Sequence, residues 1–272
     1  MAMSTTARLT ALHVYPLKSA GGIALDEARV DESGLAWDRR WLIVDAAGRF
    51  VTQRSHARMA LVRTALEEDL LRVSAPGMRA LDLPVDAAEQ EPSESVPVWG
   101  LERFARPCGT EADGWATEWL GEPCRLVRAV SPPSVRPLTD GGKVRNGFAD
   151  AYPALVVSTA SLADLNGRLV EPLPMNRFRP NLVVDGVPAY AEDGWRRVRI
   201  GETTVVGKKT CLRCAITTTD QDTGTRGIEP LRTLATFRRV PEGEVAFGMN
   251  LGFEGPGTLR LGDPVRVLEG AS

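Results

Sequence analysis

The sequence predicts a mainly β protein with short helices (α+β), in which a β-barrel is joined to a smaller β-rich domain. The first observation is a content of 19 prolines and 26 glycines, which indicates many turns. The second is that apolar runs are short and are separated by Gly-Gly, Ser-Gly and Ala-Gly pairs, as expected between neighbouring strands. The third is that helical spacing is confined to a few short segments. With 272 residues, the chain fits one large or two modest domains.

Strand patterns and turns alternate in the first half of the chain. A short helix is expected at 113–120, with Asp113 as its N-cap and Gly121 at its end. Apolar or alternating runs predict strands at 9–17, 41–45, 50–54 and 59–66.

The best domain boundary is the segment 131–142, which is rich in proline and glycine. Neither a helix nor the interior of a sheet tolerates such a composition. We therefore expect an N-terminal domain at 7–128, a linker at 129–145 and a C-terminal domain at 146–270.

The second half again combines strands with two short helices. Ser158 or Thr159 is expected to cap the first helix, and Pro230 to open the second. Each helix carries its apolar residues on one face, at 162, 165 and 169 and at 231, 234 and 237. Strands are expected at 154–157, 182–184, 195–200, 203–206 and 258–268.

The overall charge and the cysteine usage limit the partners and the compartment. A net charge of −2 gives no general attraction to nucleic acid or to an anionic membrane. No apolar run approaches the roughly 18 residues of a membrane span, and the first residues lack the apolar core of a signal peptide. Four cysteines do not form a disulfide framework at this length, and Cys108 and Cys124 stand apart from the others. We therefore expect a cytoplasmic protein that binds neither nucleic acid nor membrane.

The remaining two cysteines, Cys211 and Cys214, lie where a β-rich segment breaks into a polar turn. Lys208, Lys209 and Arg213 surround them, and cationic neighbours favour the thiolate, which is the form that binds soft metals.

A Cys-x-x-Cys pair is compatible with half a zinc site, with a redox dithiol, with one metal ligand beside a structural cysteine, or with inert packed thiols. Structural zinc needs four ligands, and the chain has no second pair and only His13 and His56. A thioredoxin-like dithiol would begin a helix, whereas residues 215–219 have the composition of a strand. Spacing alone therefore favours inert thiols and leaves a metal or redox role open.

Several cations stand at predicted strand ends. Lys18 and Ser19 precede two glycines, a combination that can present a cation, a hydroxyl and open backbone N–H groups to an anion. This is not a Walker loop, and a solvated hairpin turn is the alternative. The segments around Arg39 and Arg179 would each be ordinary surface loops, but together these donors suit an extended, polyanionic ligand.

Other catalytic schemes have little support. The chain has no Gly-x-Ser-x-Gly elbow, no His-Glu-x-x-His and no glycine-rich dinucleotide fingerprint. With only two histidines, a Ser-His-Asp hydrolase is not expected, and His56 is interpreted as a surface loop residue.

From about residue 9 to residue 268, the chain resembles the MOSC-domain proteins that include the mitochondrial amidoxime-reducing component and bacterial reductases of N-hydroxylated bases. In the N-terminal half, the resemblance is carried by Tyr15-Pro16-Leu17-Lys18-Ser19 and by residues 34–41 and 51–54. In the C-terminal half, it is carried by the cysteine loop and by 148–153, 160–166, 178–181, 229–231, 247–250 and 262–265.

The resemblance implies a closed MOSC barrel that carries an N-terminal β domain and binds a molybdenum cofactor, Mo-molybdopterin. Cys214 matches the catalytic molybdenum ligand, whereas Cys211 matches a cysteine that is not a ligand. The other positions that the resemblance assigns to the cofactor pocket are Lys18, Ser19, Arg39, Asp150, Tyr152, Arg179, Asn181, Arg213 and Asn250, the last at a site where relatives carry Tyr or Asn.

The function implied is the reduction of small N-hydroxylated compounds such as amidoximes, hydroxylamines and N-hydroxylated bases. No second redox motif is visible, so the electrons are expected from a separate donor protein of the ferredoxin or flavin reductase type. The first alternative is a carrier of molybdenum cofactor or sulfur without turnover of its own. The second is a β-rich binding module without a cofactor.

Overall fold

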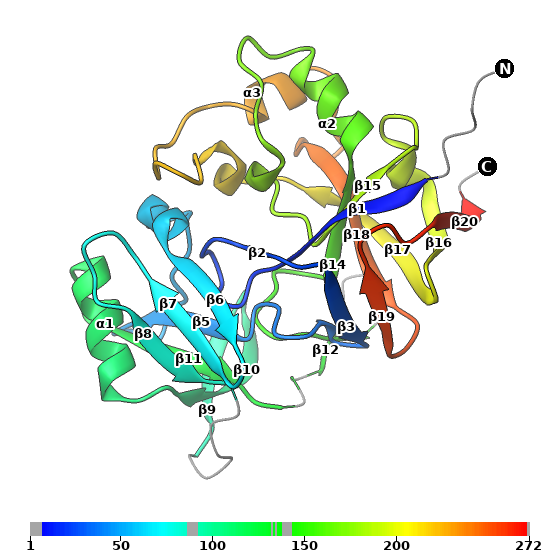
Figure 1. Ribbon diagram of the computed structural model, residues 1–272. Helices are drawn as coiled ribbons and strands as arrows, with labels where there is room; N and C mark the ends of the chain where they lie inside the picture. The colour runs from blue at the N-terminus through cyan, green and yellow to red at the C-terminus, as the bar shows by residue number, and fades with distance from the viewer. Residues whose placement is uncertain (1–6, 86–91, 132, 134, 138–142, 271–272) are drawn as a thin grey trace, which may run out of the picture.

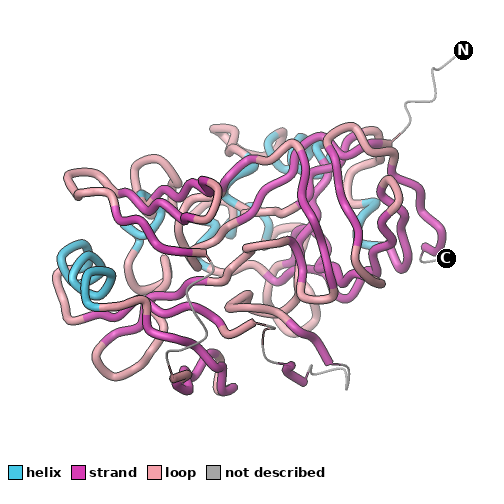
Figure 2. Tube along the Cα trace, turned by 60° about the horizontal axis from the view of Figure 1, so that its bottom comes forward, coloured by secondary structure: helices cyan, strands magenta, loops and turns pink. Residues whose placement is uncertain are grey.

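Strands dominate the computed structural model, which describes residues 7–85, 92–131, 133, 135–137 and 143–270 (Figure 2). This confirms the predicted mainly β class. No helix in these ranges is both long and apolar enough to cross a bilayer. The described helices are α1 (Thr110–Leu120), α2 (Thr159–Asn166) and α3 (Leu231–Leu234), with short 3-10 turns at η1 (Ala57–Leu61), η2 (Met175–Arg177), η3 (Ala191–Gly194) and η4 (Ala215–Thr218).

The largest sheet curves into the barrel seen at the upper right of Figure 1. Its ends approach each other, because Arg8 bridges to Pro264 and the Val265 amide donates to the carbonyl of Ala7 at 2.8 Å. Its strand order is β2 (Ile23–Ala24), β1 (Arg8–Val14), β15 (Leu182–Asp185), β14 (Ala154–Ser158), β18 (Ala246–Phe253), β17 (Thr203–Leu212), β16 (Trp195–Ile200) and β20 (Val265–Gly270).

The second lobe, at the lower left of Figure 1, packs two further sheets and α1 around a core that includes Trp41, Leu71, Trp115 and Leu126. One sheet has the order β5 (Trp41–Asp45), β11 (Cys124–Ala129), β10 (Leu101–Pro107) and β9 (Glu94–Val98). The other has the order β6 (Arg63–Glu67), β7 (Leu70–Ser74) and β8 (Leu81–Pro84).

The first strands of the chain pair with the barrel rather than with the second lobe. Strand β1 pairs with β15, and β3 (Glu27–Asp31) lies between β4 (Gly34–Leu35) and β19 (Gly257–Arg260). Within the expected linker, β12 (Val135–Pro137) pairs antiparallel with β13 (Lys143–Arg145), while residues 132, 134 and 138–142 lie outside the described residues. The division at 7–128, 129–145 and 146–270 stays a prediction.

Of the expected strands in the first half, the one at 50–54 is wrong and the one at 59–66 is only partly right. In the expected strand at 50–54, Phe50 makes only an isolated bridge to Val44. The carbonyl of Thr52 then accepts the amides of Ser55 and His56, so this polar stretch turns instead of extending. The first part of the expected strand at 59–66 is η1, and the strand itself begins only at Arg63.

The helix ends were predicted in part. Helix α1 ends at Gly121, which has the left-handed conformation expected of a C-cap (φ 75°), but it begins at Thr110. The carboxylate of Asp113 accepts the amide of Leu126 at 2.9 Å instead of capping the helix. Ser158 caps α2 as predicted, because its side chain accepts the Ser161 amide. The strands at 154–157, 182–184 and 195–200 are also confirmed, whereas α3 ends before 237 and the expected strand at 258–268 is divided into β19 and β20.

A single buried amide joins the segments that meet beneath the candidate site. Asn181, which is 1% exposed, accepts hydrogen bonds from the Arg39 guanidinium at 2.9 Å and from the Leu155 amide at 3.2 Å. It donates to the His13 carbonyl and to Asp38, both at 3.1 Å. The oxygen and the nitrogen of the amide thus both form hydrogen bonds within the protein. These bonds hold the segments around residues 13, 38–39 and 155 in fixed positions relative to one another.

The first prediction concerns this amide. An Asn181→Ala substitution would leave several buried partners without a hydrogen bond, so we expect the free energy of unfolding to fall by about 2–4 kcal/mol. Chemical denaturation followed by circular dichroism measures the loss. Asn250→Ala is the control, since Asn250 is only half-buried and the one bond that its side chain makes among the described residues is donated to the Lys209 carbonyl. Equal losses in the two variants would contradict the junction role of Asn181.

Candidate functional site

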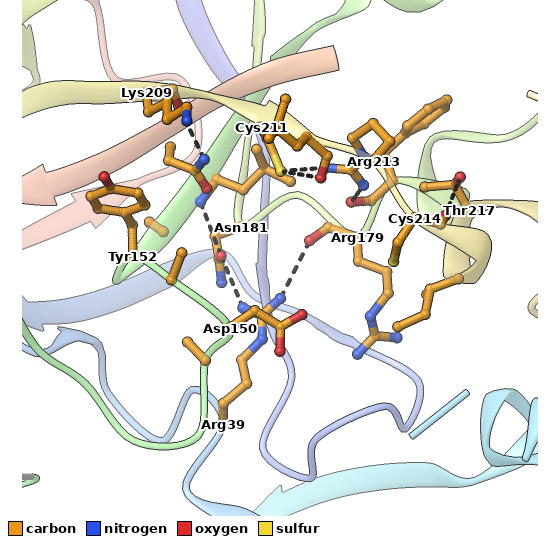
Figure 3. Close-up of a pocket in the computed structure, with 18 of the residues that line it drawn as sticks. Arg39, Asp150, Tyr152, Arg179, Asn181, Lys209, Cys211, Arg213, Cys214 and Thr217 are labelled. Carbon is orange, nitrogen blue, oxygen red and sulfur yellow. Dashed lines mark hydrogen bonds between the residues drawn. The ribbon is translucent and has the colours of Figure 1, made fainter. Parts of the chain in front are cut away.

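A cavity of about 670 Å³ lies where the barrel meets the second lobe, and residues from both halves of the chain line it (Figure 3). All ten positions singled out from the sequence face this one cavity. They are Lys18, Ser19, Arg39, Asp150, Tyr152, Arg179, Asn181, Arg213, Cys214 and Asn250. The structure also places Arg54, Trp99, Lys209 and Glu244 there, which the sequence analysis did not assign to the site.

The cysteine loop enters the cavity at the end of β17. The expected strand at 215–219 is wrong, because Ala215–Thr218 form the 3-10 turn η4. Cys214 stands at the N-cap position of this turn, and its carbonyl accepts both the amide of Thr217 at 3.1 Å and the hydroxyl of Thr217 at 2.9 Å. These bonds fix the backbone that carries the thiol, as Figure 3 shows.

The two cysteines have different surroundings. The Arg213 guanidinium donates to the Cys211 sulfur at 2.9 Å and to the Phe178 carbonyl at 2.5 Å, so it ties Cys211 to the protein. Cys214 interacts instead with Arg54 and contributes to the raised pKa of that guanidinium group. The pair is therefore asymmetric, and Cys214 is the cysteine that interacts with a cation of the second lobe.

Arg54 lies between Asp150 and Cys214. Its Nη2 atom donates to Asp150 at 2.8 Å, and its Nη1 atom is buried without a hydrogen-bond partner among the described residues. Burial alone lowers the pKa of Arg54, but the charges of Asp150 and then of Cys214 outweigh it and raise that pKa above its ordinary value. A donor of this kind can stabilise an anionic ligand group beside the thiol.

Asp150 organises the cations on this side of the cavity. Burial raises the pKa of its carboxyl, but Lys18 and Arg54 outweigh burial and hold it well below the usual range. Lys18 is 5% exposed and donates to Asp150 and, at 2.7 Å, to the Phe148 carbonyl. Burial lowers the pKa of Lys18, and Asp150 opposes this change. Asp150 is therefore an ionised anchor for two cations.

A second pair of cations stacks on Tyr15. The guanidinium groups of Arg39 and Arg179 each lie 4.3 Å from the centre of this ring, a distance typical of cation–π contacts. Burial raises the pKa of Tyr15 to about 12 and lowers that of Arg179 to about 10. Asp38 pairs with Arg39 and offsets part of this charge, and the second guanidinium adds to the positive charge of the cavity wall.

The backbone is strained at this site. The described residues Ser19 (φ 69°), Arg39 (φ 48°), Trp99 (φ 56°) and Arg179 (φ 53°) are left-handed without being glycine, and all four line the cavity. Such conformations cost about 1 kcal/mol or more each and cluster at functional sites. The close approach of two segments adds a glycine requirement, because a Cβ atom on Gly147 would lie 2.4 Å from the Arg39 carbonyl.

The charged groups of the cavity favour an anionic guest. Six cationic side chains and two carboxylates line it, although the whole chain is slightly acidic. The cations are Lys18, Arg39, Arg54, Arg179, Lys209 and Arg213, and the carboxylates are Asp150 and Glu244.

The donor set of the site suits a metal that brings most of its own ligands. In the parts of the chain that the structure describes, no three His, Cys, Asp or Glu side chains gather in a way that could hold a metal ion. Cys214 could offer one thiolate, so the remaining ligands must come from the guest. A pterin dithiolene with a phosphate tail meets this requirement, since it supplies sulfur ligands and an anion for the cationic walls. The residues present therefore fit a molybdenum cofactor.

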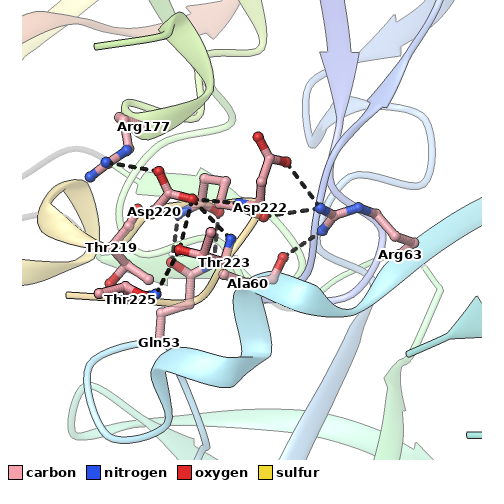
Figure 4. A network of polar contacts seen from close by, with 10 residues as sticks. Gln53, Ala60, Arg63, Arg177, Thr219, Asp220, Asp222, Thr223 and Thr225 are labelled. Carbon is pink, nitrogen blue, oxygen red and sulfur yellow. Dashed lines mark hydrogen bonds and ion pairs between the residues drawn. The ribbon is translucent and has the colours of Figure 1, made fainter. Parts of the chain in front are cut away.

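The loop that follows η4 fastens this part of the barrel to the second lobe (Figure 4). The Gln53 side chain bonds the Gln221 side chain at 3.0 Å, and Arg63 donates to the Gln221 carbonyl at 3.0 Å and to Asp222 at 3.2 Å. Asp220 stabilises the loop itself by accepting the amides of Asp222 and Thr223. Because Gln53 precedes Arg54, these contacts set the position of Arg54 relative to Cys214.

Two family models match the chain. The MOSC N-terminal beta barrel domain matches residues 6–123, and the MOSC domain matches residues 143–266. Both ranges contribute residues to the cavity.

Relatives from the same family align with nearly the whole chain. The chain is 38% identical to mitochondrial amidoxime-reducing component 1 of Mus musculus over 275 aligned positions, which cover 94% of this chain and 81% of the relative. For component 1 of Homo sapiens, the identity is 35%, with 94% and 82% covered.

A molybdenum cofactor sulfurase of Oryza sativa subsp. japonica is 32% identical over 90% of this chain, which spans only 32% of that longer protein. The alignments to the amidoxime-reducing components, by contrast, cover most of both proteins. The chain therefore belongs to the family of MOSC-domain proteins that includes the mitochondrial amidoxime-reducing components.

Proposed function

We propose that this protein is a molybdenum-cofactor-dependent reductase of small N-hydroxylated compounds, such as amidoximes, hydroxylamines and N-hydroxylated bases. The observation that carries the proposal is that Cys214 lines a cavity whose wall carries six cationic side chains and only two carboxylates. The similarity to amidoxime-reducing components over nearly the whole chain supports it. We further propose that it acts in the cytoplasm and receives electrons from a separate ferredoxin-type or flavin-containing donor.

Different residues of the cavity would bind the metal and the anionic part of the cofactor. Cys214 would offer its thiolate to the metal, while Arg39 and Arg179 on Tyr15, with Lys18 and Ser19, would hold the anionic part of the cofactor. When bound, the cofactor would supply two-electron oxygen-transfer chemistry, which no protein side chain provides.

Proton supply limits which residues take part in the reaction. Reduction of an amidoxime consumes two electrons and two protons, cleaves the N–O bond and releases an amidine and water. Asp150 stays ionised near neutral pH because its pKa is held well below the usual range, so it does not deliver these protons. Neither His13 nor His56 lines the cavity. We propose that the protons come from solvent that enters with the substrate, and that Arg54 stabilises negative charge near the thiolate.

A carrier of molybdenum cofactor or sulfur is the second candidate, since the chain is 32% identical to a molybdenum cofactor sulfurase. A carrier would release its cofactor readily and would turn nothing over.

Expression in two hosts tests the proposal. Protein from a host able to make the cofactor should contain molybdenum and reduce benzamidoxime with an artificial electron donor, whereas protein from a cofactor-deficient host should do neither. Equal turnover by the two preparations would contradict the reductase. Molybdenum that dissociates freely from an inactive protein would favour the carrier.

The cysteines provide a matched pair of variants. Cys214→Ser should lose at least about a hundredfold in kcat while the protein stays folded, because the hydroxyl is a poor soft-metal ligand. Cys211→Ser should retain most of the activity, because Cys211 is bonded to Arg213 and is not the proposed ligand. Steady-state kinetics and molybdenum content measure both, and similar losses in the two variants would exclude the assignment.

Arg54 provides a further prediction. Arg54→Leu should lower both retained molybdenum and kcat by about tenfold, because one charge-assisted contact beside the thiolate is removed. Arg54→Lys should give a molybdenum content and a kcat between those of the parent and of Arg54→Leu, since lysine keeps the charge but lacks the planar guanidinium group. Arg197→Leu is the control, because Arg197 pairs with Glu254 on the surface of the barrel. Full activity in Arg54→Leu would refute this role.

A further inference from the structure

The hairpin between β9 and β10 brings an unexpected residue to the cavity. Its tip is Trp99-Gly100, and both residues have positive φ (56° and 73°), as in a type I′ turn. Asparagine, aspartate or glycine normally takes the first of these positions, so tryptophan is strained there. The turn itself gives no reason for a tryptophan, which directs attention to what its side chain contacts.

Three neighbours fix the orientation of the indole. Its N–H donates to Asp150 at 3.0 Å, the Arg54 guanidinium lies 4.7 Å from the ring centre, and Phe50 packs edge to face at 5.0 Å. Trp99 nevertheless remains 49% exposed, and it lines the cavity. A rigidly held aromatic surface is thus left open to a guest.

The ring also shares the cavity with the proposed metal ligand. Trp99 and Cys214 both line it, together with Arg54, whose guanidinium group lies 4.7 Å from the centre of the Trp99 ring. The indole and the thiol therefore face the same guest. A substrate bound next to Cys214 would reach the indole if it carried a planar ring.

We propose that Trp99 is a specificity-determining residue that stacks against planar, conjugated N-hydroxylated substrates, such as aryl amidoximes and N-hydroxylated nucleobases. Small aliphatic hydroxylamines gain nothing from this surface. The proposal rests on the reductase function and names the substrate class of that site. Any planar conjugated ring can stack on an aromatic side chain, whatever its pattern of hydrogen-bond donors and acceptors, because every such ring has a π-face.

A purely positioning role is the competing explanation, in which the indole N–H only orients Asp150. The two explanations differ in Trp99→Phe, which keeps an aromatic ring but loses the N–H donor. They also differ in Trp99→Leu, which keeps apolar bulk but loses the ring. Phe104→Leu is a matched control, since Phe104 is similarly exposed (48%) on β10 but does not line the cavity.

The experiment compares benzamidoxime with hydroxylamine as substrates of the molybdenum-loaded protein. The ratio of their kcat/KM values should fall roughly tenfold in Trp99→Leu, mainly through the KM of benzamidoxime. Trp99→Phe should retain most of the ratio, and Phe104→Leu should leave it as in the parent. A ratio unchanged in Trp99→Leu, or lost to the same extent in Trp99→Phe, would overturn the proposal.

A binding measurement separates this inference from the proposed function. Calorimetry with benzamidine, the product of benzamidoxime reduction, should show roughly tenfold weaker binding to loaded Trp99→Leu than to the parent. Equal affinities would exclude the stacking surface. If the parent binds benzamidine but reduces neither substrate, the reductase function fails while the binding comparison still decides the role of Trp99.

Discussion

The carboxylate of Asp150 is the contact on which the arrangement of the site depends. It accepts hydrogen bonds from Lys18, Arg54 and Trp99, three residues that come from separate turns of the N-terminal half. Asp150 itself lies between β13 and the barrel strand β14. One ionised group therefore joins the two lobes and orients the cations beside Cys214. Burial alone would oppose this charge, and the neighbouring cations outweigh that penalty.

The same arrangement explains why the cavity is both strained and positive. The mutual repulsion of the cations on the cavity wall and the left-handed residues of its lining both destabilise the folded chain. An anionic guest would relieve this repulsion, so binding and stability are linked: cofactor bound to the folded state stabilises it. The two cysteines also differ in their contacts. Arg213 donates a hydrogen bond to the Cys211 sulfur, whereas Cys214 interacts with Arg54 of the other lobe.

Much of the architecture could be predicted from residue patterns. Short apolar runs located most strands, and Ser158 and Gly121 marked helix ends correctly, since these signals are local. Polar stretches were harder. Residues 50–54 and 215–219 resemble strands in composition, but both segments turn. The Gln53 side chain bonds Gln221 from the other half of the chain, and the Thr217 hydroxyl bonds the Cys214 carbonyl within its own turn. The family resemblance identified ten residues that line one cavity. It did not identify Arg54, which lies in a segment expected to be a strand, or Trp99, which occupies a turn position that tryptophan rarely takes. Pairing of β1 with β15 joins residues far apart in sequence, which no local pattern indicates.

The most direct test of the central claim is molybdenum K-edge X-ray absorption on protein loaded with cofactor. If the thiolate of Cys214 completes the coordination of the metal, the parent protein should show one more sulfur neighbour around molybdenum than Cys214→Ser, and Cys211→Ser should match the parent. Identical sulfur counts in the parent and in Cys214→Ser would contradict the account.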